Sequence, residues 1–425
     1  MKLGIKTGVL VFCALVVVPA SAEDAADLKR KIALDEAFPD PDGATYFAGE
    51  ITLVEHVNRR GILRLDRDGS MNKYYWDLPH HFQMLPYGSI FLQGAPAELK
   101  DIPLGTHLHG EFYYGPEGAV VVTPPKTDYE ASKLPRPDLR SVETAYSRVF
   151  RFEDDFSFYQ RQGSGWKITG IAEALNEITL ERVSLANGEP VKPGKDVQGP
   201  TGTQVLRMDR GTQVWKGREF AALEDLAVGQ IVQRNTGWMT LLGSYEQDGL
   251  CREIWIDDES RKVAATRQLG RHISHQQRRG IPAKILKTES VPGEGARGYA
   301  VVQIHAGVAE ELMDAFQEKV GLDVSAVEPS LRTWGPFSKP ASIVAVNEVA
   351  NPEPGSSGVE LRLHFYEMVE GFRVGRTVRM ALRDWKAPEV PREERLDPND
   401  VRIFSVGPPY ITGRDAAPTA AESNP

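Results

Sequence analysis

Cysteine is scarce in this 425-residue chain, which holds only Cys13 and Cys251. Cys13 lies inside the first apolar segment, which we expect to be removed, so the mature chain keeps a single cysteine. An intramolecular disulfide is then excluded, even in the oxidising compartments where disulfides usually form. The stability of the mature chain must therefore come from the burial of apolar side chains.

Long apolar runs are also missing beyond the first twenty residues. The run at the start, Val9–Val18, follows Lys2 and Lys6 and precedes an Ala-Ser-Ala site that ends at Ala22. A positive start, a short apolar core and small residues at the cleavage point are typical of a secretory signal peptide. Ten apolar residues are too few for a stable membrane anchor, which is the alternative interpretation. We therefore expect a signal peptide over residues 1–22, cleavage near Ala22, export to the periplasm or the extracellular space, and no transmembrane segment in the mature chain.

Three motifs of common enzyme classes do not occur: the G-x-S-x-G elbow, the Walker A loop and the H-E-x-x-H zinc motif. One dinucleotide-like motif, Gly293-Glu-Gly-Ala-Arg-Gly298, does occur. It precedes an apolar, strand-like run at Tyr299–Ile304, whereas pyrophosphate binding needs a helix N-terminus at that place. A hairpin turn is therefore the better interpretation.

Basic residues are fewer than acidic residues. The chain has 50 Lys and Arg against 59 Asp and Glu, a formal charge of −9. The charge becomes −11 once Lys2 and Lys6 leave with the signal segment. This balance argues against binding nucleic acid over the whole surface, although it allows a local basic patch.

The sequence does contain one phrase in three copies. Each copy has an apolar residue six places before a glycine, another directly before it and a third three places after it; the glycines are Gly105, Gly229 and Gly375. The first two copies also share an aspartate, Asp101 or Asp225, four places before the glycine. Aspartate favours turns and glycine accepts positive φ, so each copy predicts a tight turn that leads into a strand.

The glycines are 124 and 146 residues apart, a domain-sized spacing in a chain long enough for two to four domains. We therefore predict a mainly β protein with a few helices, built from three related small antiparallel barrels, OB-like or SH3-like, in tandem. The alternative is a coincidence of turn–strand phrases in unrelated domains. The predicted segments are a signal peptide (1–22), a leader (23–43), unit one (44–123), a Pro-rich bridge (124–147), unit two (148–256), a basic helix (257–280), unit three (281–407) and a disordered tail (408–425).

Several stretches around these phrases resemble an uncharacterised family of exported planctomycete proteins. The stretches are Leu78–Phe82, Leu85–Gly88, Gly94–His109, Phe152–Ser157, Arg279–Pro282 and Gly371–Gly375. The resemblance spans most of the mature chain. It implies an exported protein of several barrels, and it implies no activity.

Four of the nine histidines fall within thirty residues: His80, His81, His107 and His109. Two of them, His107 and His109, lie two apart on a predicted strand, so both rings leave the same face about 6.6 Å apart. Neutral imidazole is a common ligand of Zn and Cu, so the four form a candidate metal site. The repeat places Leu108 in the barrel core, so the pair should point out of that core and meet a metal only in a cleft or at a unit interface. Surface or turn histidines are the alternative.

Basic residues gather between Arg261 and Lys287, where eight occur without an Asp or Glu. Most lie on the predicted helix, which begins near Asp257–Glu259 and ends before Gly280. Its candidate anion-binding residues are Arg261, Lys262, Arg267, Arg271 and Arg278. The alternative is a solvated helix face whose arginines pair with acids elsewhere in the fold.

Two functional hypotheses follow. In the first, the chain is an exported, non-enzymatic binding or scaffold protein without a cofactor, and the joints between its barrels or the basic helix form the contact surface. Its partner would be an anionic glycan, a lipid surface or an acidic protein, and nucleic acid is disfavoured. In the second, it is a metal-dependent protein, for example a hydrolase, that holds Zn or Cu with the histidines of unit one. A stoichiometric metal would favour the second.

Overall fold

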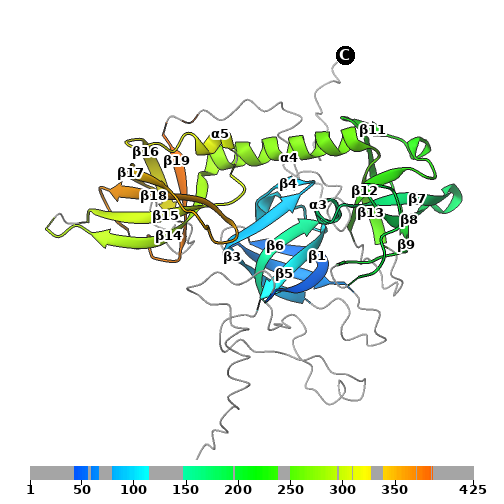
Figure 1. Ribbon diagram of the computed structural model, residues 1–425, viewed down its shortest axis with the longest axis horizontal. Coiled ribbons are helices and arrows are strands. Elements are labelled where there is room, and N and C mark those ends of the chain that lie inside the picture. Colours follow the sequence, from blue (N-terminus) through cyan, green and yellow to red (C-terminus); the bar gives the residue numbers. More distant parts are fainter. Residues whose placement is uncertain are drawn as a thin grey trace, which may run out of the picture.

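The computed structural model describes residues 43–55, 59–66, 79–113, 147–194, 197–237, 249–293, 296–308, 310–326, 338–369, 371–383 and 385. The predicted signal peptide, nearly all of the predicted leader and Pro-rich bridge, and the C-terminal tail lie outside these residues. The described part forms three closed β-barrels that follow one another along the chain (Figure 1). The expectation of a mainly β protein with three small barrels in tandem is confirmed.

Barrel 1 surrounds a core that includes Ile51, Leu63, Leu108 and Phe152. Its strands run in the order β2-β1-β5-β6-β3-β4, and a β2–β3 pairing closes the barrel. The pair β3–β6 is parallel. The elements are β1 (Thr45–Glu55), β2 (Arg60–Leu65), β3 (Pro79–Leu92), β4 (Ala95–Pro96), the 3₁₀ helix η3 (Leu99–Asp101), β5 (His107–Tyr113) and β6 (Arg148–Asp154).

One boundary differs from the expected one. Residues 148–154 were expected to open unit two, but they form β6, which pairs with β5 and β3 of barrel 1. Barrel 1 needs this strand to close, because β3 and β5 have no direct pairing in the sheet. The boundary between the two barrels along the chain therefore falls at the helix that follows β6.

Barrel 2 has a core that includes Trp166, Ile168, Val232 and Ile254. Its strand order is β11-β10-β13-β12-β7-β8-β9, and a parallel β13–β9 pairing closes it. The elements are β7 (Ser164–Ala172), η4 (Glu173–Leu175), β8 (Glu177–Ser184), β9 (Thr203–Arg207), β10 (Gln213–Lys216), β11 (Glu219–Ala221), η5 (Leu223–Asp225), β12 (Ile231–Gly237) and β13 (Gly249–Trp255).

Barrel 3 closes through antiparallel pairs alone, in the order β14-β15-β18-β17-β16-β19. On β18 the residues Leu361, Leu363 and Phe365 alternate into the core, as the period-two pattern predicts. The elements are β14 (Ile281–Ser290), β15 (Gly298–His305), α5 (Glu310–Met313), β16 (Gly321–Ala326), β17 (Ser338–Glu348), β18 (Ser356–Phe365) and β19 (Thr377–Leu382).

The three repeated phrases occupy equivalent places in the three barrels. Gly105, Gly229 and Gly375 have φ angles of 88°, 94° and 82°. Each donates its backbone N–H to a core isoleucine on the first strand of its own barrel; the bonds to the carbonyls of Ile51, Ile168 and Ile285 measure 2.8, 2.7 and 2.8 Å. The third residue after each glycine (Leu108, Val232, Val378) is fully buried. The phrase is thus one structural device used three times.

The helices connect the barrels. The short α3 (Asp155–Arg161) joins barrel 1 to barrel 2, and α4 (Asp258–Arg279) leads from barrel 2 to barrel 3. Helix α4 begins where the side chain of Asp257 accepts the N–H of Ser260 at 2.7 Å, and it ends at Gly280 with φ 84°. The predicted basic helix is therefore confirmed. Barrel 3 also contains the short helix α5, and turns follow it.

Helix α4 contacts all three barrels: β4 of barrel 1, β10 and β13 of barrel 2, and β14 and β19 of barrel 3. Figure 1 shows it running along one side of the molecule, across barrel 1. Twenty-two residues at about 1.5 Å each give a length of about 33 Å. Barrel 1 consequently has two junctions, one with barrel 2 through α3 and one with barrel 3 beneath the C-terminal half of α4.

Candidate functional site

The histidine pair of β5 lies at the junction between barrels 1 and 2. As the repeat predicts, Leu108 faces the barrel core, and His107 and His109 leave the opposite face of the strand. Both rings are nonetheless buried, with 7% and 2% of their surface exposed. Barrel 2 and α3 cover them.

The other two candidate histidines lie elsewhere. His80 is fully buried on β3, and its ring centroid is 4.9 Å from that of Phe112 and 5.3 Å from that of Phe47. His81 follows it on β3 and is half-buried. Among the described residues, the cluster with metal-ligand geometry contains neither of them. The structure therefore brings together two of the four predicted ligands.

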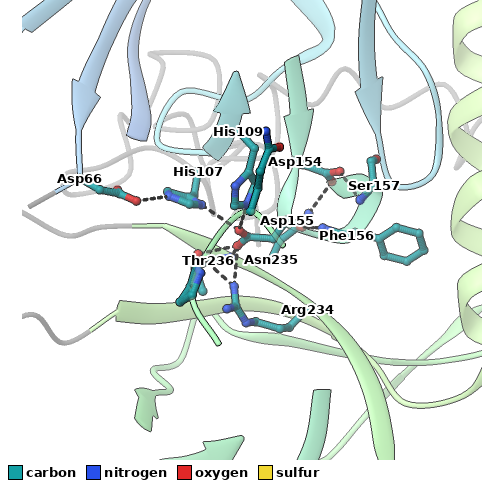
Figure 2. A network of polar contacts seen from close by, with 12 residues as sticks. Asp66, His107, His109, Asp154, Asp155, Phe156, Ser157, Arg234, Asn235 and Thr236 are labelled. Atoms are coloured by element: carbon teal, nitrogen blue, oxygen red, sulfur yellow. Dashed lines mark hydrogen bonds and ion pairs between the residues drawn. The ribbon is translucent and has the colours of Figure 1, made fainter. Parts of the chain in front are cut away.

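Asp155, the first residue of α3, joins the two barrels (Figure 2). Its Oδ1 atom lies 2.8 Å from His107 Nδ1 and 2.7 Å from His109 Nε2, both from barrel 1. Its Oδ2 atom accepts three hydrogen bonds from barrel 2. The donors are Arg234 Nη1 at 2.7 Å, the backbone N–H of Thr236 at 2.7 Å, and the Thr236 hydroxyl. One buried carboxylate thus binds barrel 1 through Oδ1 and barrel 2 through Oδ2.

The far sides of both imidazole rings are also held. Asp66 Oδ2 lies 2.9 Å from His107 Nε2. The Tyr46 hydroxyl lies 2.7 Å from His109 Nδ1. Since a carboxylate only accepts, His109 must carry its proton on Nε2, and Tyr46 donates to the free Nδ1.

The charges in this cluster balance. Burial alone would lower the pKa of His107, but Asp66 and Asp155 outweigh it and raise the pKa to about 10, so the ring is an imidazolium. Burial lowers the pKa of His109 to about 4 despite its bond to Asp155, so that ring is neutral. Burial would raise the pKa of Asp155, but Arg234 and His107 hold it well below its usual range. Two carboxylates therefore face two cations, which is the condition for keeping buried charges.

His107, His109 and Asp155 also offer three potential metal ligands, whose atoms lie within 4.8 Å of one another. Ligands of a tetrahedral zinc ion, each about 2.0–2.1 Å from the metal, would be about 3.3 Å apart. The two N···O separations here, 2.8 and 2.7 Å, are hydrogen-bond distances instead. Arg234 already occupies the other carboxylate oxygen. A metal at this place would have to displace protons from both rings and move Asp155.

A second buried network continues the same junction (Figure 2). Asp154 Oδ1 caps α3 by accepting the N–H of Ser157, and Oδ2 accepts from the Gln93 backbone and from Asn235 Nδ2, at 2.8 to 2.9 Å. Asn235 Nδ2 and Gln93 Nε2 also lie 3.3 Å from the carboxylate of Glu253. Burial raises the pKa of Asp154 to about 6 and that of Glu253 to about 7.

The five candidate anion-binding residues of α4 differ in exposure. Lys262 and Arg278 are exposed, and the other three are half-buried. Arg261 pairs with Asp258, the Arg267 guanidinium lies 4.9 Å from the Trp215 ring centroid, and Arg278 donates to Ser274 Oγ at 2.8 Å. Three further cations of the segment pair with acids; the pairs are Arg279–Glu98, Lys284–Glu353 and Lys287–Glu289. Most of the basic segment thus has partners within the fold, and anion binding by its outer face stays a prediction.

The second junction forms a cavity of about 380 Å³, partly open to solvent, between barrel 1, barrel 3 and the last turns of α4. Barrel 1 lines it with β3, β4 and η3, barrel 3 with residues of β14, β15, β16 and β19, and α4 with His272, Gln276 and Arg279. Its charged lining residues are Arg59, Lys100, Arg279, Arg379 and a single carboxylate, Glu98. Positive charge therefore predominates on its walls.

No protein-family model, no curated protein sequence and no solved structure matches this chain. Within the described residues, no helix combines the length and the apolar character that crossing a membrane requires.

Sequence reasoning missed the residues that complete both junctions. Asp155 had a signal, because Asp-Asp followed by Ser two places later is a helix start that puts one carboxylate at the cap and leaves the next free. Arg234 and Arg379 had none, since ordinary strand patterns surround them. His305, the buried histidine of the cavity, ends an apolar strand and gave no pattern of its own.

Proposed function

We propose that this chain is an exported, non-enzymatic binding protein in which barrel 1 is fixed to barrel 2 and receives a ligand at its junction with barrel 3. The observation that carries the proposal is the cavity beneath α4, whose walls come from two barrels and one helix. Cavities of about 300–1,000 Å³ with a few convergent polar groups are the usual form of a small-molecule site. Export follows from the predicted signal peptide.

The closed junction supports this division of roles. The Asp155 network uses both carboxylate oxygens and three of the four nitrogens of the two rings for contacts between elements, and Tyr46 takes the fourth. Bonds to both Asp155 oxygens and to all four ring nitrogens hold the neighbouring elements in one arrangement. Barrel 1, fixed to barrel 2, then presents a wall against which barrel 3 and α4 complete the cavity.

The test is to fill the cavity and measure ligand-dependent stabilisation. Ala306 lines the cavity and is exposed, so Ala306→Trp should occupy it without disturbing a barrel core. Ala222→Trp, at an exposed position of barrel 2, is the matched control. Thermal unfolding is followed with inorganic phosphate, citrate, glucose and choline. A ligand at 100 times its Kd stabilises by about 2.7 kcal/mol.

We expect at least one probe to raise the unfolding temperature of the parent and of Ala222→Trp, and not that of Ala306→Trp. If no probe gives a shift that Ala306→Trp removes, the cavity is not the binding site and the proposal is wrong.

One observation favours the alternative, a metal-dependent protein: His107, His109 and Asp155 converge, and Asp66 backs one ring as outer carboxylates do in metal sites. Elemental analysis of the purified chain decides between them. One equivalent of Zn or Cu, lost in His107→Ala with His109→Ala and kept in His81→Ala, would establish the metal protein. Its absence in the parent would leave the network as a structural junction.

A further inference from the structure

The cavity at the second junction gathers like charges. Arg59, from the turn before β2, donates to the backbone carbonyls of Leu85, Pro86 and Gly88 at 2.6 to 3.0 Å, which fixes its guanidinium against β3. Arg379, from β19 of barrel 3, reaches the same cavity. Burial, reinforced by repulsion from Arg379, lowers the pKa of Arg59 to about 10. A cation of barrel 3 therefore repels a fixed cation of barrel 1.

One internal anion compensates part of this charge. Glu98 accepts two bonds from Arg379, at 3.0 and 2.7 Å, and one from Arg279 at 3.3 Å. Burial by itself would raise the pKa of Glu98, but Arg379 outweighs it and lowers the pKa to about 2. Glu98 also attracts Arg59, although it does not offset the effect of burial and of Arg379 on the pKa of Arg59. One carboxylate thus serves three arginines.

His305 adds a hydrogen-bonding group that has no partner. Its ring is 4% exposed and packs edge-on against Tyr87 at a centroid distance of 5.1 Å. Its Nε2 atom has no hydrogen-bond partner among the described residues. Burial, reinforced by Arg59, Arg379 and Lys284, holds the pKa of His305 well below its usual range, so the ring is neutral. A buried polar atom left unpaired costs free energy, which a bound group would recover.

The volume limits the size of the occupant. About 380 Å³ corresponds to the space of roughly a dozen water molecules. A small organic acid or a phosphorylated small molecule fits this space, whereas a polymer would need an open groove.

We propose that the cavity binds a small molecule through a carboxylate or phosphate group, held by Arg59, Arg379 and the Nε2–H of His305. This inference rests on the proposed binding function and names its ligand class. An oxyanion relieves the repulsion between the two guanidinium groups and accepts a hydrogen bond from Nε2 of His305 in its Nε2–H tautomer. Phosphate and carboxylate share this chemistry, and separate probes distinguish them.

The experiment is isothermal titration calorimetry on the mature full-length chain with inorganic phosphate, citrate and glucose 6-phosphate, with ionic strength held constant by NaCl. Glucose and choline chloride are the neutral and cationic probes. We expect at least one of the three anions to bind at one equivalent, and neither glucose nor choline to bind. Binding of citrate alone would indicate a ligand with a carboxylate. Binding of inorganic phosphate or glucose 6-phosphate would indicate a phosphorylated ligand.

Two pairs of variants locate the site. Ala306→Asp puts a carboxylate at the cavity wall and should weaken anion binding at least tenfold, whereas Ala306→Asn has nearly the same size and should stay within threefold. His305→Phe keeps the ring and removes the donor, so affinity should fall about tenfold. His364→Phe is the matched control, because His364 is a half-buried β18 histidine outside the cavity lining.

The outcomes separate the two proposals. Suppose that glucose or choline binds, that Ala306→Trp abolishes this binding, and that no anion binds. The proposed binding function then stands, and the proposal of an anionic ligand is wrong. Anion binding that is equal in Ala306→Asp and Ala306→Asn would place the anion outside the cavity and overturn the inference. Circular dichroism checks that each variant is folded, and should His305→Phe be unfolded, the Ala306 pair decides alone.

Discussion

The two junctions of barrel 1 are built from similar residue types and differ in charge balance. At the junction with barrel 2, Asp66 and Asp155 face His107 and Arg234 in one network, in which all but the half-buried Asp66 are buried. At the junction with barrel 3, four cations line a cavity with one carboxylate, Glu98, and Lys100 also pairs with Asp101 behind the wall. The difference indicates that a neutralised junction serves as a structural joint, whereas an unbalanced one retains a place for an outside anion.

The largest expected effect is at the closed junction. Asp155→Asn removes the charge that compensates Arg234 and His107, and breaking a buried ion pair from one side typically costs about 3–5 kcal/mol. We expect a loss of unfolding free energy on the order of 3 kcal/mol or more in urea titrations. The control is Asp258→Asn, whose side chain is 79% exposed in its pair with Arg261; it should stay within about 0.5 kcal/mol. Similar costs for the two variants would show that the network does not hold the barrels.

The barrel cores should respond alike, whichever junction they adjoin. Val232→Ala and Val378→Ala each remove buried methyl groups from equivalent repeat positions and should cost about 1–3 kcal/mol. The controls come from the same phrases: Val228 and Val374 are 64% and 59% exposed, so changing them to alanine should cost less than about 0.5 kcal/mol. If the exposed valines cost as much as the buried ones, the phrase has been assigned the wrong face.

The closed junction should also be sensitive to pH. Burial raises the pKa of Glu253 to about 7 from an ordinary value of 4.5, so the folded state binds this proton more tightly than the unfolded state. Its contribution is therefore complete below about pH 4.5 and is lost as pH rises through 7. Each unit of pKa difference corresponds to about 1.4 kcal/mol. Glu253→Gln should flatten the fall in unfolding free energy between pH 4.5 and 7.5 by on the order of 2 kcal/mol; an unchanged profile would contradict the assignment.

The smallest effect on stability is expected at the open junction. Glu98→Gln removes the carboxylate between Arg379 and Arg279, and the solvent-connected cavity limits the cost to about 1–2 kcal/mol. The same change adds to the positive excess, so citrate should bind about three- to tenfold more tightly. Weaker citrate binding in Glu98→Gln would mean that Glu98 positions the arginines for the ligand and does not compete with it.

The repeated phrase made the architecture predictable. Its apolar spacing and its positive-φ glycine describe one local device, and each barrel contains one. The same register predicted that His107 and His109 would leave the core of barrel 1. These inferences worked because they concern a single strand and the turn before it.

The partners across each junction could not be predicted in the same way. Asp155, Arg234 and Thr236 meet only because two barrels dock, and docking leaves no period in the sequence. Arg59 and Arg379 are 320 positions apart and reach one cavity for the same reason. The excess of basic residues on α4 gave a partial signal for the open junction, since Arg279 lines the cavity while most of the others have partners elsewhere.

Hydrogen exchange of the full mature chain tests the contrast between the junctions most directly. It is measured without ligand, with saturating citrate, and with inorganic phosphate or glucose 6-phosphate, whichever binds more tightly. We predict that the ligand slows exchange around the cavity, in residues 88–99 of barrel 1, 272–279 of α4 and 305–307 of barrel 3. Residues 155–157 and 234–236 at the closed junction should exchange at the same rate in both states. Protection confined to the closed junction, or the same small protection at both, would contradict the account.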